Sequence, residues 1–180
     1  MDRDDHTRSP IGFKTAPRFG GHIVLDLLNT VTRTEVGSAD QFTDIETVCH
    51  WLAESGLPYE SASNEPKLVD AIVDLREIVR ELIQCRMLGT AANPALLNEY
   101  LGATEGHWEL VWKREVEEPS RSFVRTGDAI AVVIAPLAEA AAELLTSGDF
   151  ASVKRCGNPE CSMVFFDPSA TSRRRWCDMA

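Results

Sequence analysis

The sequence predicts an α+β fold, with a mainly helical body that contains one small β-hairpin and a compact C-terminal module that carries cysteines. Two observations predict the body. Apolar residues recur at helical spacing through most of residues 22–150, and one stretch near residue 110 alternates with a period of two, as strands do. The third observation is that three of the five cysteines lie in residues 151–180. Residues 1–21, with polar residues, prolines and a Gly-Gly pair, are expected to form a poorly ordered arm.

Length and composition favour one ordinary domain with a small appendage. The chain has 180 residues, of which 44% are hydrophobic and 26% charged, as in typical globular proteins. No N-terminal stretch resembles a signal peptide, and the longest uncharged run, Ala129 to Ala138, is too short to span a bilayer. We therefore expect a cytoplasmic protein with no membrane contact.

Helical periodicity marks five segments of the body, at residues 23–31, 45–55, 64–88, 93–101 and 136–145. Thr43 and Glu46 form the pattern of a capping box before the second segment. A glycine follows the second, third and fourth segments closely enough to end each helix. Pro136 favours a last helix that begins or kinks at that residue.

Between the last two helices, the pattern changes to that of a β-hairpin. Trp108, Leu110 and Trp112 occupy every second position, and residues 122–126 form a second run compatible with a strand. The polar loop around Glu117 is expected to be exposed. We expect the two tryptophans to cover a core rather than to stack on nucleic-acid bases.

The cysteines of the C-terminal module have the spacing of metal ligands. Four residues separate Cys156 from Cys161, and fifteen separate Cys161 from Cys177. A tight turn can direct the first two sulfurs at one tetrahedral ion, and cytoplasmic cysteines favour metals over disulfides. Strands at residues 163–166 and 173–176 would return Cys177 to this pair. The sequence therefore predicts a zinc site, and the alternative is three buried thiols that bind no metal.

A closed structural zinc site has four ligands, and the module contains no histidine. The fourth ligand could come from the body, from a neighbouring chain or from residues beyond Ala180. We expect it beyond Ala180, and without it we expect weakened zinc binding.

Charge is distributed unevenly along the chain. Five basic and three acidic residues give residues 151–180 a net charge of +2, which leaves −12 for residues 1–150. An acidic body with a basic tail indicates contact of the tail with nucleic acid. The candidate phosphate-binding residues are Lys154, Arg155, Arg173, Arg174 and Arg175. The alternative is a solvated basic face that balances the acidic body.

Polar side chains of the body form two candidate ligand-binding groups: Asp26, Asn29, Thr30 and Arg33 on one face of the first helix, and Arg76 and Arg80 on the longest helix. The first group mixes the donors and acceptors that a small polar ligand requires, and the two arginines could hold a carboxylate or phosphate. The alternatives are a solvated face or an internal cap for the first group, and pairing with Glu77 and Glu81 for the second. The histidines lie outside any recognisable catalytic motif, so we expect no enzyme.

The C-terminal module resembles the CGNR zinc finger. The matching positions are, in order, Cys156, Cys161, Phe166-Asp167, Arg173 to Arg175 and the run Trp176 to Met179. The chain ends before the Cys-Gly-Asn-Arg that names this finger. The body resembles the ABATE domain through residues 25–30 (LDLLNT) and 75–80 (LREIVR). The resemblance implies a bacterial stress-induced transcription regulator, with a treble-clef-like finger on DNA and a body that senses a small ligand.

Two further hypotheses remain open at this point. In one, the finger is a protein-interaction or dimer-forming module whose arginines meet an acidic partner, such as the body of a second subunit. In the other, the face that carries Asp26 and Arg33 acts on a small-molecule substrate.

Overall fold

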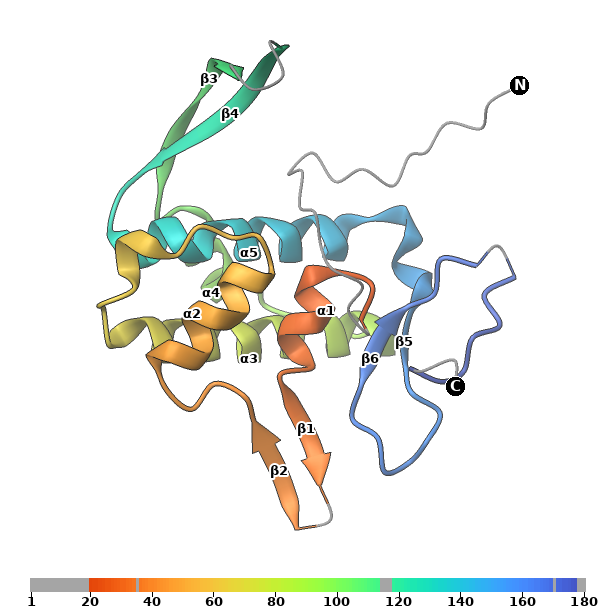
Figure 1. Ribbon diagram of the computed structural model, residues 1–180. Helices are drawn as coiled ribbons and strands as arrows, with labels where there is room; N and C mark the ends of the chain where they lie inside the picture. The colour runs from red at the N-terminus through yellow and green to blue at the C-terminus, as the bar shows by residue number, and fades with distance from the viewer. Residues whose placement is uncertain (1–19, 35, 114–117, 170, 178–180) are drawn as a thin grey trace, which may run out of the picture.

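The computed structural model describes residues 20–34, 36–113, 118–169 and 171–177 (Figure 1). The predicted N-terminal arm therefore lies almost entirely outside the described residues, as do Glu117 in the hairpin loop and Asp178 and Met179 of the finger motif. The helices are α1 (Ile23–Leu28), α2 (Ile45–Glu54), α3 (Lys67–Leu88), α4 (Ala95–Leu101) and α5 (Ala129–Thr146), with short 3-10 helices η1 (Glu60–Ala62) and η2 (Gly148–Ser152). The strands are β1 (Val31–Thr34), β2 (Gly37–Asp40), β3 (Glu105–Lys113), β4 (Glu118–Thr126), β5 (Val153–Arg155) and β6 (Val164–Phe166). The predicted α+β class is confirmed.

The core of the body lies between α3 and α5, which run along the molecule with α1, α2 and α4 packed against them (Figure 1). The inner stripe of α3, including Leu68, Ile72 and Leu75, is fully buried. Ile134 and Leu137 of α5 meet this core from the other side. Burial of these apolar side chains holds the helices together.

Local signals fix several helix ends as predicted. Helix α3 stops at Gly89, whose φ of 68° is the left-handed conformation that glycine adopts without strain. Helix α4 follows Asn93 and Pro94, and the Asn93 side chain accepts a hydrogen bond from the Ala95 amide. The capping box of α2 lies one residue later than the predicted pair Thr43 and Glu46. Asp44 and Thr47 form it, because the Asp44 carboxylate accepts from the Thr47 amide and the Thr47 hydroxyl accepts from the Asp44 amide.

Helix α1 is shorter than its periodicity predicts. The helix ends at Leu28, and the following residues form an antiparallel pair of strands, β1 and β2. Asn29 caps the helix, and the Thr30 hydroxyl donates to the Leu27 carbonyl. Arg33 consequently lies on a strand, so the prediction that it shares a helix face with Asp26 is wrong.

Helix α5 begins at Ala129, after its cap residue Asp128, and contains Pro136 within the helix. Of the two predicted alternatives, a helix that begins at the proline is therefore wrong, and the preceding apolar run is helical as well. By length and composition α5 could cross a membrane, with a mean hydropathy of 1.8, but half of it is buried in the body. Packing against α1, α3 and α4 accounts for its apolar character.

The hairpin of β3 and β4 is confirmed, but the expected role of its tryptophans is wrong. Trp108 is 50% exposed and Trp112 is 62% exposed. Figure 1 shows why, since the hairpin extends away from the helices instead of packing flat on them. The tryptophans therefore cover no part of the core.

In the C-terminal module β6 pairs with β5, with Val153 opposite Phe166. The predicted returning strand at residues 173–176 is absent from the described residues. The reason is that side chains, rather than a neighbouring strand, bind the backbone of this segment. The Asp167 carboxylate accepts from the Arg174 amide, and the Lys154 ammonium donates to the Ser172 carbonyl.

Candidate metal centre

The turn between β5 and β6 carries the first two cysteines. Cys156 follows β5 directly, and its amide donates to the Met163 carbonyl at 2.9 Å, which closes the turn. Within the turn, the Asn158 carbonyl accepts from the Cys161 amide at 3.0 Å, and the Asn158 side chain accepts from the Glu160 amide at 3.0 Å. The backbone thus positions both thiols before any ion is considered.

A glycine brings the third cysteine to this turn. The Gly157 amide donates to the Arg175 carbonyl at 2.7 Å. A β-carbon on Gly157 would lie 3.0 Å from that oxygen, so a side chain here would push the returning segment away. The close approach leaves the Cys177 Sγ 3.7 Å from the Cys161 Sγ.

The geometry of the three thiols fits a zinc ion. The ligand atoms of Cys156, Cys161 and Cys177 all lie within 4.8 Å of one another. Sulfurs bound at about 2.3 Å to a tetrahedral zinc are separated by about 3.8 Å, so small inward movements suffice. Among the described residues the group consists of these three cysteines. The predicted zinc site is therefore supported, and a fourth ligand beyond Ala180 stays a prediction.

Two of the thiols, Cys156 and Cys177, have pKa values shifted in opposite directions. Hydrogen bonds from the backbone amides of Asn158 and then Cys177 lower the pKa of Cys156 to about 7. Burial, and then the neighbouring thiols, raise the pKa of Cys177 to about 12. Cys156 therefore ionises at lower pH than Cys177, and a bound cation favours ionisation of Cys177 because it offsets the repulsion between thiolates.

A buried carboxylate organises the rest of the finger. Asp167 is 1% exposed, and its Oδ2 accepts from the Lys154 ammonium at 2.7 Å and from the Arg174 amide at 3.0 Å. The Ser169 hydroxyl donates to Oδ1 at 2.6 Å. The Lys154 bond, followed by the Ser169 bond, holds the pKa of Asp167 well below its usual range. Asp167 therefore ties β5 to the returning segment.

The five candidate phosphate-binding residues fall into two groups. Lys154 and Arg174 are half-buried and make internal bonds. The Arg174 guanidinium donates to the Trp176 carbonyl at 2.9 Å and lies 4.5 Å from the ring centre of Phe165. Arg155, Arg173 and Arg175 are exposed instead. In the described finger these three form no ion pair, although the Arg175 guanidinium lies 5.7 Å from the ring centre of Trp176.

Asn29 joins the finger to the body. Its side-chain Nδ2 donates to the Val164 carbonyl at 2.8 Å, and its Oδ1 accepts from the Val164 amide at 2.9 Å. The asparagine amide thus pairs with β6 as a neighbouring strand would. On the exposed side of the same contact, the Arg33 amide donates to the Ser162 hydroxyl at 3.1 Å. The finger is therefore fixed to the end of α1.

The other candidate ligand-binding residues also make internal bonds. Arg76 is 2% exposed, donates to the Thr30 hydroxyl at 2.8 Å and forms a two-pronged pair with Asp40. Arg80 donates to the Leu28 carbonyl at 3.0 Å. Both arginines also pair with Glu77, at 3.2 and 3.1 Å, as that alternative holds for Glu77, and their binding of a ligand stays a prediction.

Asp26 is buried, and its Oδ1 accepts from the Gly20 amide at 2.9 Å. Asn29 and Thr30 are buried as well. A solvated face, one of the alternatives for these residues, is therefore wrong, whereas their binding of a ligand stays a prediction.

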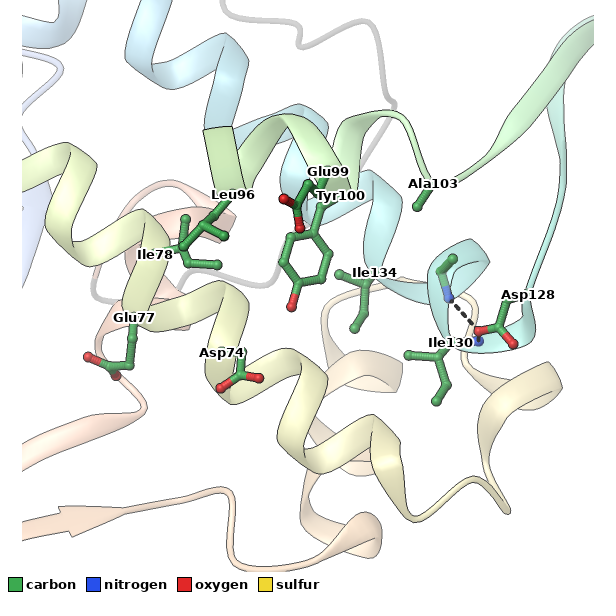
Figure 2. Close-up of a pocket in the computed structure, with 11 residues that line it drawn as sticks. Asp74, Glu77, Ile78, Leu96, Glu99, Tyr100, Ala103, Asp128, Ile130 and Ile134 are labelled. Carbon is green, nitrogen blue, oxygen red and sulfur yellow. Dashed lines mark hydrogen bonds between the residues drawn. The ribbon is translucent and has the colours of Figure 1, made fainter. Parts of the chain in front are cut away.

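A separate cavity of about 620 Å³ lies between α3, α4 and the start of α5 (Figure 2). Its apolar lining includes Ile78, Leu96, Ile130 and Ile134, and its acidic lining consists of Asp74, Glu77, Glu99 and Asp128. Tyr100 lies among them, and burial, followed by the charges of Asp74 and Glu99, raises its pKa. Sequence reasoning missed this site because its residues come from three separate helices and form no motif.

Comparison with known families assigns both parts of the chain. Residues 21–148 match the model of ABATE, described as "Putative stress-induced transcription regulator". Residues 152–180 match the model of the CGNR zinc finger. Among curated proteins, none matches the chain.

Proposed function

The chain belongs to the ABATE family and carries a CGNR zinc finger, and we propose on this premise that it regulates transcription by binding DNA through the finger. In this proposal zinc holds Cys156, Cys161 and Cys177 together, and the body responds to a small ligand. The proposal places the protein in the cytoplasm and contains no catalytic step.

The observation that carries DNA binding is the set of free arginines on the finger. In the described part of the chain, no carboxylate forms an ion pair with Arg155, Arg173 or Arg175. The finger's buried carboxylate, Asp167, is already paired with Lys154. Unpaired arginines can neutralise DNA phosphates, and each phosphate contact makes the affinity depend on salt.

The test measures binding of duplex DNA over a range of salt concentrations. We expect the double variant Arg173→Ala/Arg175→Ala to bind more weakly, and the slope of log affinity against log salt to fall by about 1 to 2. The matched control is Lys67→Ala, an exposed cation at the start of α3. DNA binding that is absent at low salt, or equal in the double variant and the wild type, would contradict the proposal.

The same variants address the alternative that the finger contacts protein. The acidic body, with a net charge of −12 over residues 1–150, favours contact with the finger arginines of a second copy. If that contact is their role, Arg173→Ala/Arg175→Ala abolishes self-association and leaves DNA binding unchanged.

The cavity between α3, α4 and α5 supports the ligand-sensing half of the proposal. Its volume lies in the range of small-molecule sites. No ion pair neutralises Asp74 or Glu99 within the described residues, whereas the lining between them is apolar. This chemistry fits an organic cation with an apolar body.

Glu77 offers a physical link from this cavity to the finger. It lines the cavity and also pairs with Arg76 and Arg80. Arg76 donates to the Thr30 hydroxyl, and Arg80 donates to the Leu28 carbonyl. Leu28 and Thr30 lie on either side of Asn29, the residue that binds the finger. A cation that competes for Glu77 would loosen this end of α1 and so alter how the finger is held.

Phenethylammonium is a suitable probe, with 2-phenylethanol as its neutral counterpart. We expect the ammonium to raise the melting temperature of the wild type, and the rise to disappear in Asp74→Asn/Glu99→Gln. Equal shifts with the neutral alcohol, or an unchanged shift in the variant, would remove the basis for a cation site here.

A further inference from the structure

The hairpin of β3 and β4 has one face that nothing in the described chain covers. Trp108 stands opposite Phe123, Leu110 opposite Arg121 and Trp112 opposite Pro119 in the antiparallel register. Because side chains alternate between the faces of a strand, these three pairs share one face. Leu110 is 77% exposed, and both tryptophans are at least half exposed.

Contacts within this face keep it ordered. Trp108 and Phe123 pack edge to face with ring centres 5.0 Å apart, and the Arg121 guanidinium lies 4.0 Å from the ring centre of Trp108. At the base of the hairpin Arg125 pairs with Glu139 of α5. The exposed aromatic face is therefore held on the body in a defined orientation, and little conformational entropy is lost when it binds a partner.

The charge of the hairpin decides which kind of partner fits. Strands β3 and β4 contain three acidic and three basic residues, so their net charge is zero. DNA and anionic membranes attract proteins through clustered positive charge, which these strands lack. Tryptophan and arginine on one face are instead the composition of protein interfaces.

A second copy of the chain fits this face for two reasons. First, the face carries both partners of a cation–π contact. Arg121 stacks on Trp108 within one copy, and it can stack in the same way on a tryptophan of another copy. Second, the rest of the chain repels itself. Residues 1–150 carry a net charge of −12, and the hairpin, whose two strands have no net charge, extends away from the helices (Figure 1). Contact at the hairpin lets two copies meet while their acidic bodies stay apart.

The exposed area agrees with a dimer of modest stability. From their exposed fractions, Trp108, Leu110 and Trp112 together present on the order of 400 Å². Two such faces, with Arg121 and Pro119 beside them, would bury roughly 1,000 Å² in total, near the lower end for specific interfaces. We propose that the face formed by Trp108, Leu110, Trp112 and Arg121 is the contact through which two copies of this chain dimerise.

The consequence for DNA recognition rests on the proposed function. A two-fold dimer carries two fingers, so its DNA target would consist of two related half-sites. Dimerisation itself is measured without DNA, so the two proposals can fail separately.

The experiment is sedimentation velocity of the full chain over about 1 to 100 µM, with circular dichroism to check the fold of each variant. Leu110→Glu places a charge on the proposed contact, and Trp112→Ser removes apolar area without adding charge. Val111→Glu is the matched control, since Val111 is exposed on the opposite face of the same strand.

We expect the wild type to dimerise as its concentration rises. Leu110→Glu and Trp112→Ser should weaken the dimer at least about tenfold, and Val111→Glu should leave it within about twofold. A wild type that stays monomeric throughout, or a control that weakens the dimer as much as Leu110→Glu, would overturn the proposal.

Discussion

Replacement of Asn29 by alanine removes two hydrogen bonds to β6 and leaves the one from the Phe166 amide to the Gly20 carbonyl. Asn29 is 8% exposed and Val164 is 7% exposed, so water has little access to the Val164 amide and carbonyl that remain. A buried polar group left without its partner costs about 1 to 3 kcal/mol. Two such groups predict a loss of about 2 to 5 kcal/mol, a large part of the stability of an ordinary domain.

Urea unfolding followed by circular dichroism measures this loss. With a slope of about 2 kcal/mol per molar urea, the midpoint of Asn29→Ala should fall by about 1 to 2.5 M. Asn98→Ala is the control, because Asn98 is an exposed asparagine on α4. A midpoint within about 0.3 M of the wild type would refute the reasoning, since it would mean that the finger is not held to the body by this side chain.

Three further predictions concern single side chains. Cys177→Ser should abolish the thiolate-to-cobalt absorption of the protein loaded with Co²⁺, whereas Cys49→Ser, outside the cluster, should keep it. Arg174→Met should lower the stability of the finger by roughly 1 to 3 kcal/mol in urea unfolding, because bonds to backbone carbonyls and the contact with a phenylalanine ring are lost. Hydrogen bonds from Arg76 lower the pKa of Asp40. The pair therefore stabilises the fold fully at any pH above the ordinary carboxyl pKa of about 3.9. This stabilisation is lost as the pH falls through the lowered pKa of Asp40. With chelator present, the stability gap between the wild type and Asp40→Asn should be constant near neutral pH and close in acid, and a gap that widens in acid would contradict this assignment.

The parts of the fold that depend on neighbouring residues could be predicted from the sequence. In helices α3 and α4 the apolar stripe, the first turn and the glycine that ends the helix lie within one short stretch of sequence. The helical spacing of the apolar residues and the signals at the helix ends therefore agree. The hairpin likewise follows from the alternation of Trp108, Leu110 and Trp112. The end of α1 could not be predicted, because Asn29 bonds to Val164, 135 residues further along the chain. No local pattern records a partner so distant.

The basic residues of the finger illustrate a second limit. A charge count places Lys154 and Arg174 with the three exposed arginines, since all five lie near the cysteines. The structure separates them, because the buried Asp167 carboxylate binds the Lys154 ammonium and the Arg174 guanidinium donates to the Trp176 carbonyl. A buried carboxylate needs a charged or hydrogen-bonding partner, but the sequence cannot tell which nearby cation supplies it. Net charge therefore predicted the sign of the surface but not the residues that carry it.

The polar residues at the end of α1 connect these observations. A body can influence a finger only if the two are joined by contacts that differ between two states of the protein. Asn29 joins the two parts in the described state, and Arg76 and Arg80 fix the residues on either side of it. Glu77 pairs with both arginines and is one of the residues that line the cavity, so in the proposed function a ligand there would act on the Asn29 contact through this residue. Glu77→Gln should then reproduce the effect of the ligand on the finger without any ligand, whereas Asp74→Asn should only weaken ligand binding.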